Sequence, residues 1–244
     1  MIRAMNRFEV SLEDAGYGAM IVVPKLSLAV SGGELMVLLG SNGAGKTTSL
    51  RAVVGTVKTA RRSIKLDGED LSRLNAWQLA RRAIAFVPDG ARCFANVSVI
   101  DNLTGALEAI APHATAAERK RRFDMVFELF PILHERREQL AGSMSGGQRQ
   151  MLAISRGLMI EPRVMILDEP SAGLAPKLVE EVFEALGRIK AASGCAILMA
   201  EQNVAAAMSV ADRCLILSEG RVMLEGNIDD VRNDERLRVA YLGL

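Results

Sequence analysis

The sequence has few aromatic residues, cysteines and histidines, and its charges nearly cancel. Of 244 residues only 4% are aromatic, three are cysteine and two are histidine. The net charge of +1 provides no strong field that would draw the chain to nucleic acid or lipid, so we expect no nucleic-acid partner. Cys93, Cys195 and Cys214 lie far apart without metal-ligand spacing, which favours buried thiols in a reducing cytosol.

Long hydrophobic runs are also missing. No apolar stretch approaches the ~18 residues of a membrane-spanning helix, and the opening MIRAMNRFEV does not resemble a secretory signal. What is present is an ordinary globular composition, 50% hydrophobic and 24% charged. The basic runs are short, and we interpret them as solvated faces rather than as binding sites for a polyanion.

Short strands and helices alternate at both ends of the chain. Continuous apolar runs, typical of strands buried on both faces of a parallel sheet, occur at 35–39, 83–87, 164–167 and 196–200. A helical pattern from Pro176 to about Ala192 separates the last two of these runs. Parallel strands require helical crossovers, so this order predicts an α/β core.

Other short segments predict antiparallel strands. At the N-terminal end FEVSL, MIVV and KLSLAV each read as a strand. Two segments, SIKLDGED (63–70) and CLILSEGRVMLE (214–225), each place a two-residue turn between β-rich runs and predict hairpins. The last residues, DDVRNDERLRVAYL, predict a helix.

Residues 98–160 have a different character, with mostly helical patterns. Thr115 and Glu118 form a capping-box pattern at the start of an amphipathic helix, which Pro131 ends. We therefore predict a single domain over 1–244. Its catalytic α/β core comprises 1–88 and 162–244, and a helical subdomain occupies 89–161.

A glycine-rich loop follows the first buried strand and precedes a helix, which is the context of a phosphate-binding P-loop. Its backbone N–H groups turn inward around phosphate oxygens, Lys46 reaches the β- and γ-phosphates, and the Thr47 hydroxyl takes a Mg²⁺ position. The alternative is a glycine-rich turn without a ligand. The residues predicted to hold the phosphates of a nucleotide are Gly40, Ser41, Asn42, Gly43, Ala44, Gly45, Lys46, Thr47 and Thr48.

Two carboxylates follow the buried strand at 164–167. Asp168 comes directly after the strand, at the sheet edge where ligands bind in open α/β folds, and we predict that it holds Mg²⁺ through water. Glu169 is one residue further and points elsewhere, in a position to accept a proton from an attacking water. The alternative is that both residues merely solvate the end of a strand.

A second glycine-containing segment, SMSGGQRQ (143–150), precedes a helical run. A small residue and exposed backbone at a helix N-terminus form an anion site. No lysine stands beside this segment, which leaves open whose phosphate it would bind. The alternative is a capped helix start with a glycine turn.

Together these motifs make the chain similar, nearly end to end, to an ATP-binding-cassette (ABC) ATPase subunit. The resemblance implies a P-loop NTPase fold with a RecA-like core, an antiparallel β subdomain and an inserted helical subdomain. In that family the signature motif of one subunit faces the P-loop of a second, and ATP lies between them. Four residues match this signature and are expected to contact the partner's ATP: Ser145, Gly146, Gly147 and Gln148.

Four further positions carry over from the resemblance. Tyr17 lies where the family has its adenine-stacking aromatic, with a core tyrosine as the alternative. Asp89 replaces the usual Mg²⁺-contacting glutamine, and Gln202 replaces the usual histidine that contacts the γ-phosphate. Gln202 can position phosphate and water but cannot transfer a proton, which leaves Glu169 as the base. Ala175 replaces an aspartate, so it predicts a weaker contact between subunits.

Three segments resemble the branch of this family that energises import of branched-chain amino acids, with relatives for urea and amides: VPDGARCFANVSVIDNL, DEPSAGLAP and AEQNVAAAMSVADR. The resemblance implies ATP and Mg²⁺, a second identical or different ATPase subunit, integral membrane permease subunits and, indirectly, a substrate-binding protein. It implies a place at the cytoplasmic face of the membrane. The apolar Phe94 and Val97 suit either a permease-docking patch or a buried loop.

Two alternatives remain open from the sequence. The chain could be a nucleotide-sensing subunit that closes on ATP but hydrolyses it slowly, as Gln202 and Ala175 would allow. It could also be an ATPase of DNA repair or of ribosomes, although such proteins usually have two cassettes or long coiled-coil insertions, which do not fit into 244 residues.

Overall fold

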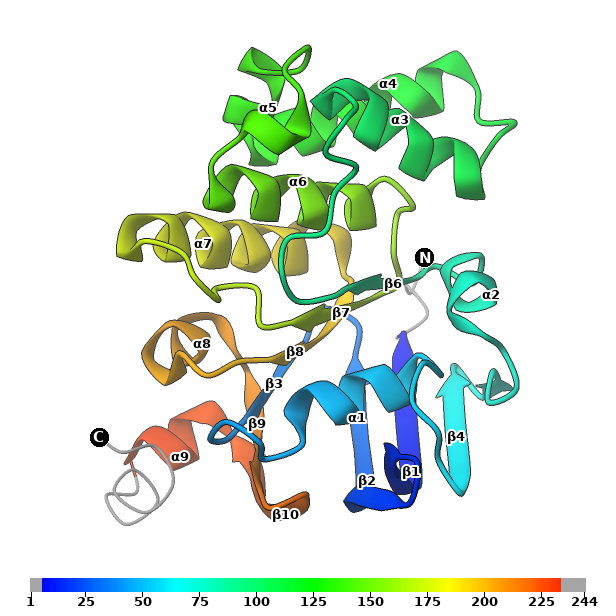
Figure 1. Ribbon diagram of the computed structural model, residues 1–244, viewed down its shortest axis with the longest axis vertical. Helices are drawn as coiled ribbons and strands as arrows, with labels where there is room; N and C mark the ends of the chain where they lie inside the picture. The colour runs from blue at the N-terminus through cyan, green and yellow to red at the C-terminus, as the bar shows by residue number, and fades with distance from the viewer. Residues whose placement is uncertain (1–5, 234–244) are drawn as a thin grey trace.

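The computed structural model describes residues 6–233 and is built around a six-stranded sheet with strand order β10-β9-β3-β8-β7-β6 (Figure 1). Neighbouring strands from β9 to β6 are parallel, and β10 pairs antiparallel with β9. All residues of β3, β7 and β8 are buried, as the continuous apolar runs predict. The strands are β3 (Leu35–Leu39), β6 (Ile84–Val87), β7 (Val164–Asp168), β8 (Ala196–Ala200), β9 (Arg213–Ser218) and β10 (Arg221–Asn227).

A second, antiparallel sheet has the order β2-β1-β4-β5, with β1 (Arg7–Tyr17), β2 (Met20–Ser31), β4 (Arg61–Leu66) and β5 (Glu69–Asp70). The prediction of two separate strands, MIVV and KLSLAV, is wrong, because β2 runs through both. Pro24 lies inside it but lacks a backbone N–H. Since β2 is at the edge of its sheet, that missing donor breaks no bond to a further strand.

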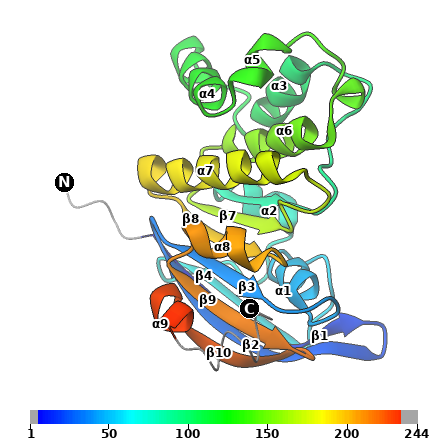
Figure 2. The ribbon, with the colours of Figure 1, turned by 90° about the vertical axis from the view of Figure 1, so that its left-hand side faces the viewer.

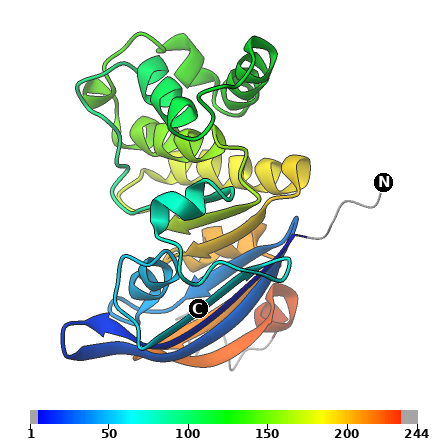
Figure 3. The same cartoon turned by 90° about the vertical axis from the view of Figure 1, so that its right-hand side faces the viewer.

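Helix α1 (Lys46–Val53) lies between the two sheets (Figures 1 and 3) and packs against strands of both. One hydrophobic cluster includes residues of α1, of the antiparallel sheet and of one face of the large sheet, such as Met36 and Leu38 of β3. The alternate residues of β3 face the other way, into a second cluster. The period-2 alternation of strands therefore builds two cores on one central sheet.

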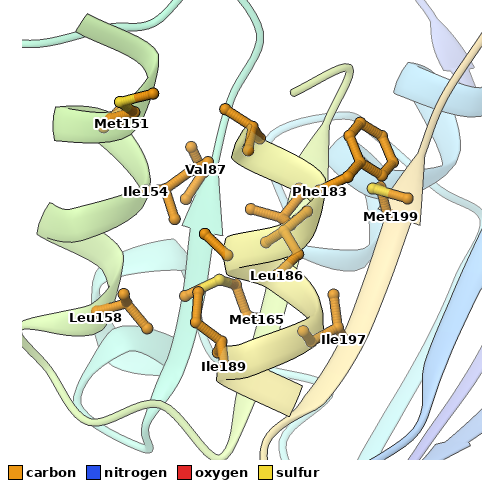
Figure 4. Close-up of a cluster of buried hydrophobic side chains, with 14 of the residues drawn as sticks. Val87, Met151, Ile154, Leu158, Met165, Phe183, Leu186, Ile189, Ile197 and Met199 are labelled. Carbon is orange, nitrogen blue, oxygen red and sulfur yellow. The ribbon is translucent and has the colours of Figure 1, made fainter. Parts of the chain in front are cut away.

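The opposite face of the large sheet is covered by α6 (Gly146–Leu158) and α7 (Pro176–Ser193). Figure 4 shows Val87 of β6 next to Ile154 of α6, and Met199 of β8 next to Phe183 of α7. Helices α3 (Val99–Ile110), α4 (Ala116–Leu129) and α5 (Pro131–Glu135) lie beyond α6, away from the sheets (Figures 1 and 2). The predicted α/β fold with an antiparallel sheet and a set of inserted helices is confirmed.

Most predicted elements are present, with a few differences. Both hairpins form, β4–β5 and β9–β10, and the Thr115 capping box opens α4. Helix α2 (Ala76–Ala80) and the 3-10 turn η1 (Ala141–Ser143) were not predicted. Helix α8 (Val204–Val210) follows β8, and α9 (Ile228–Asn233) is the start of the predicted last helix, whose remainder lies outside the described residues. Within 6–233, no helix combines the length and apolar character that crossing a bilayer requires.

Candidate functional site

The glycine-rich loop connects β3 to α1 at the carboxyl end of β3. Gly40, Gly43 and Gly45 have φ values of 154°, 81° and 100°, a region that other residues rarely adopt. A Cβ atom on Gly40 would also lie 2.3 Å from the backbone oxygen of Leu217 in β9. The loop therefore needs glycine for its conformation and, at Gly40, for close packing on the neighbouring strand.

Lys46 begins α1 and lies in the concavity of this loop. Its side chain is only 4% exposed, and its Nζ donates hydrogen bonds to the backbone oxygens of Gly40 (2.8 Å) and Ser41 (3.1 Å). Burial lowers the pKa of Lys46, and the charges of nearby carboxylates, first that of Glu169 at 3.8 Å from Nζ, oppose this shift. A buried ammonium that is held mainly by neutral carbonyl groups is well suited to bind an anion.

Asp168 ends β7 and faces the start of α1. The residue is 1% exposed, which rules out the alternative that it merely solvates a strand end. Its Oδ1 accepts a hydrogen bond from Thr47 Oγ1 (2.8 Å), whereas its buried Oδ2 has no hydrogen-bond partner. Burial raises the pKa of Asp168, with a smaller contribution from the charge of Asp89, while the Thr47 hydrogen bond lowers it.

These oxygens fit a magnesium ion that arrives with phosphate. Mg²⁺ prefers oxygen ligands and usually combines one or two carboxylates with phosphate oxygens. The unpaired Asp168 Oδ2 and the Thr47 hydroxyl are donors of this kind. In the part of the chain that the structure describes, no cluster of three or more His, Cys, Asp or Glu could hold a metal by itself. A cation here would therefore need further oxygen ligands from water or from a bound ligand.

Glu169 points away from Asp168 because its backbone turns through a left-handed conformation with φ 48°. Its backbone N–H donates to the oxygen of Ala200 at the end of β8 (2.9 Å). Its Oε1 accepts a hydrogen bond from Gln202 Nε2 (2.7 Å). The loop after β8 thus places an amide donor on the carboxylate that the sequence analysis selected as the base.

Asp89 and Tyr17 come from two other elements, and Asp89 pairs with Arg51. Asp89, two residues after β6, accepts a hydrogen bond at Oδ1 from Arg51 Nη2 (2.9 Å). Tyr17, at the end of β1, is 46% exposed, so the alternative of a core tyrosine is wrong. Burial lowers the pKa of Arg51, but a hydrogen bond with Tyr17 and the charges of Asp89 and Asp168 raise it, and the net shift is upward. The sequence analysis did not single out Arg51.

Ser145 is the N-cap of α6 and forms a capping box with Gln148. Gln148 N donates to Ser145 Oγ (3.3 Å), and Ser145 N donates to Gln148 Oε1 (3.1 Å). A Cβ atom on Gly146 would meet nothing within 4 Å. Within 6–233 no hydrogen bond or ion pair joins residues 145–148 to the loop at 40–48. The segment is therefore a capped helix start, as the alternative interpretation expected. The open position at Gly146 also leaves space for a ligand from outside the chain.

Glu201 is a buried residue of this region that the sequence analysis did not assign. It is 1% exposed, and its carboxylate accepts backbone hydrogen bonds from Ser171 N (2.9 Å), Gln202 N (2.8 Å) and Asn203 N (2.9 Å). Glu201 therefore ties the loop after β7 to the loop after β8. No pattern in the sequence distinguishes it from a surface glutamate, because all three donors are backbone groups.

The Glu201→Ala variant is expected to lose about 2 kcal/mol or more of unfolding free energy, because one buried and two partly buried backbone donors lose their acceptor. Glu201→Gln should lose less, since its amide oxygen still accepts. Glu180→Ala, on an exposed turn of α7, is the matched control. Urea denaturation of the four proteins measures the differences, and equal midpoints for Glu201→Ala and Glu180→Ala would contradict this assignment.

Comparison with known proteins identifies the family of the chain. Residues 23–172 match the family model described as ABC transporter. The chain is 39% identical, over 93% of its length and 95% of the relative's, to the high-affinity branched-chain amino acid transport ATP-binding protein BraG of Pseudomonas aeruginosa. It is 36% identical, over 93% of each chain, to the lipopolysaccharide export system ATP-binding protein LptB of Escherichia coli K12.

Solved structures show the same fold. An ATP-binding subunit of an ABC transporter superposes with a TM-score of 0.80 at 29% identity, covering 96% of each chain. The ADP conformation of an ATP-binding cassette superposes with a TM-score of 0.78 at 22% identity, covering 99% of this chain and all of that one. With a matching family model over most of the chain and relatives above 30% identity, this protein belongs to the ABC transporter family and is an ATP-binding ATPase subunit.

Proposed function

We propose that the chain is the ATP-hydrolysing subunit of an ABC importer that energises the uptake of branched-chain or other hydrophobic amino acids. The convergence of Lys46, Asp168 and Glu169 at the carboxyl edge of one sheet is the observation that supports hydrolysis most directly. Each residue has a different role in hydrolysis: Lys46 binds phosphate, Asp168 binds the metal and Glu169 activates water.

In this scheme the glycine loop wraps the phosphates of ATP, and Lys46 transfers its Nζ hydrogen bonds from the loop carbonyls to phosphate oxygens. Residues 40–48 surround the phosphates, and Tyr17 is exposed for stacking on the adenine. Thr47, Asp168 and Asp89 would hold Mg²⁺, and the ion would neutralise the charge that develops on the phosphate oxygens.

Glu169 orders the attacking water and accepts its proton. Gln202 holds the Glu169 carboxylate through the 2.7 Å hydrogen bond and cannot itself exchange a proton at neutral pH. The two residues divide the task, one as the base and the other as the group that positions it.

Each pocket is completed by a second ATPase subunit, identical or different. The N-terminus of α6 supplies the Ser145 hydroxyl and the backbone around Gly146 and Gly147 to the nucleotide on the partner. Support comes from the open space at Gly146 and from the absence of polar contacts between this segment and the P-loop of the same chain, within 6–233. Ala175, the N-cap of α7, makes no side-chain cap hydrogen bond and offers little to such a partner.

The loop after β6 is proposed to dock on membrane permease subunits at the cytoplasmic face of the membrane, which would link the chain indirectly to a substrate-binding protein. Phe94 and Val97 are 61% and 38% exposed, which contradicts the alternative of a buried loop. Arg156 of α6 stacks over the Phe94 ring at 4.6 Å. A groove of about 370 Å³ beside Phe94 is mostly apolar and includes Pro88 and Ile160.

The transported substrate is inferred from the resemblance to the branch of the family that imports branched-chain amino acids. The 39% identity to BraG, together with Asp89 and the segment from Glu201 to Asn203, favours an amino-acid importer. Import of urea or short amides is the alternative in the same branch. The 36% identity to LptB makes lipopolysaccharide export the competing class.

Replacing Lys46 by alanine in the native host is expected to abolish most uptake of radiolabelled leucine, because phosphate binding loses its buried cation. Uptake of radiolabelled urea should remain unchanged, which makes it the internal control. Loss of urea uptake with normal leucine uptake would support the alternative importer. Altered lipopolysaccharide export with both uptakes intact would contradict import.

A slow nucleotide sensor is favoured only by Gln202 and Ala175. The rate of ATP turnover by the purified chain with its partners distinguishes a sensor from an ATPase. Turnover above that of a Lys46→Ala control supports hydrolysis, and equal turnover supports the sensor.

A further inference from the structure

Arg51 is a charged residue of the site that has no role in the proposed hydrolysis mechanism. It lies on α1 four residues after Thr47, so both side chains are on the same face of the helix. Its Nη2 donates to Asp89 Oδ1 (2.9 Å), and its Nε lies 3.9 Å from Asp168 Oδ2. One guanidinium therefore contacts carboxylates from the ends of two strands, β6 and β7.

The charges around Asp168 show why this contact matters. Asp168 Oδ2 is buried and has no hydrogen-bond partner. Lys46 is engaged with two loop carbonyls and with Glu169. Among the residues the structure describes, Arg51 is the one cationic side chain within 4.0 Å of an Asp168 oxygen. Because an unpaired buried carboxylate is costly, the Arg51 charge stabilises the site in the absence of nucleotide.

We propose that Arg51 is an internal counter-ion that takes the place of a divalent cation at Asp89 and Asp168 and prevents free Mg²⁺ from binding there. This inference rests on the proposed function, because it assumes that these carboxylates hold the metal. A cation entering alone would meet the Arg51 charge at short range. A cation bound to ATP brings phosphate oxygens that offset this repulsion and offer Arg51 a new anionic partner. Metal and nucleotide would therefore enter together.

The ion pairs of Asp89 are consistent with a counter-ion role for Arg51. Its carboxylate is 43% exposed and pairs with Arg51 at 2.9 Å and with Arg92 at 3.7 Å. Two arginines on one carboxylate leave it with no excess negative charge toward a bound triphosphate. The pairing therefore explains how an acidic residue can stand at a position where the family usually has a neutral glutamine.

Binding of Mn²⁺, followed by the loss of its free electron paramagnetic resonance signal, tests the proposal on the nucleotide-free chain. Arg51→Met is expected to bind free Mn²⁺ about tenfold or more tightly than the unmodified chain, because a positive charge is removed next to two carboxylates. Arg51→Lys should resemble the unmodified chain, since it retains the charge. Arg51→Met combined with Asp89→Asn should lose most of the gain.

Thermal unfolding identifies any variant that does not fold, in which case Arg51→Gln replaces Arg51→Met. Equilibrium dialysis with Mn²⁺ and ATP on both sides of the membrane tests the proposed function by itself, because it counts the Mn²⁺ that the chain retains, whereas ATP alone already removes the free Mn²⁺ signal. If the unmodified chain binds Mn²⁺ with ATP, but Arg51→Met and the unmodified chain bind free Mn²⁺ equally, the counter-ion role is wrong and the nucleotide site stands. If the unmodified chain binds no Mn²⁺ even with ATP, the proposed function itself fails.

Discussion

Glu169→Gln is expected to lower ATP turnover by about a hundredfold or more while ATP binding is retained, because an amide cannot accept a proton from the attacking water. The substitution is nearly isosteric. Its Oε1 can still accept the hydrogen bond that Gln202 Nε2 donates in the native chain at 2.7 Å. The geometry is therefore preserved while the base is removed, and the closed pair of subunits should accumulate with ATP.

Steady-state phosphate release, equilibrium ATP binding and size-exclusion chromatography with ATP measure these three effects. Glu161→Gln is the matched control. Glu161 has φ 51°, close to the 48° of Glu169, but it pairs with Arg121 and Arg122 away from the site. Full turnover in Glu169→Gln would show that another group accepts the proton.

Gly146→Asp should also lower turnover by about a hundredfold, but without weakening the fold of the isolated chain. Gly146 is the first residue of α6, and its Cβ position is open. An aspartate at a helix N-terminus is favourable by about 0.3–1 kcal/mol. In the proposed two-subunit arrangement, however, its charge would face the γ-phosphate held by the second subunit and oppose closure of the pair.

Gly105→Asp on α3 is the matched control, because it adds the same charge at another open glycine position of the inserted helices. Thermal unfolding, ATP affinity of the isolated chain and turnover of the assembled pair are compared. Unchanged turnover in Gly146→Asp would contradict a role across the subunit interface. Weakened ATP binding in the isolated chain would place the signature within the same pocket instead.

The elements around the phosphate loop were predictable because their signals are local. The apolar run of β3, the glycines at φ 81° and 100° and the helix that begins at Lys46 follow one another in the chain. The same applies to α6, whose capping box spans only four residues. Local patterns specify these elements because the backbone needs glycine, a cap or an apolar run at those positions.

The strand β2 shows where local patterns mislead. Pro24 separates MIVV from KLSLAV in the sequence, yet one strand from Met20 to Ser31 contains both. Whether a proline interrupts a strand depends on whether its missing N–H is needed, and that depends on which strands lie beside it. The sheet order, with β2 at the edge, decided the matter.

The sequence by itself determined the family of the fold, and it predicted the P-loop, the carboxylate pair and the signature segment, because each is a short pattern with its own backbone requirement. Only the tertiary structure showed that Arg51 faces Asp89, 38 residues away, and that Glu201 accepts the N–H of Ser171, 30 residues away. These contacts join separate strand ends, and their energies depend on burial and on neighbouring charges. The burial of these side chains and the charges around them are defined only once the sheets have assembled.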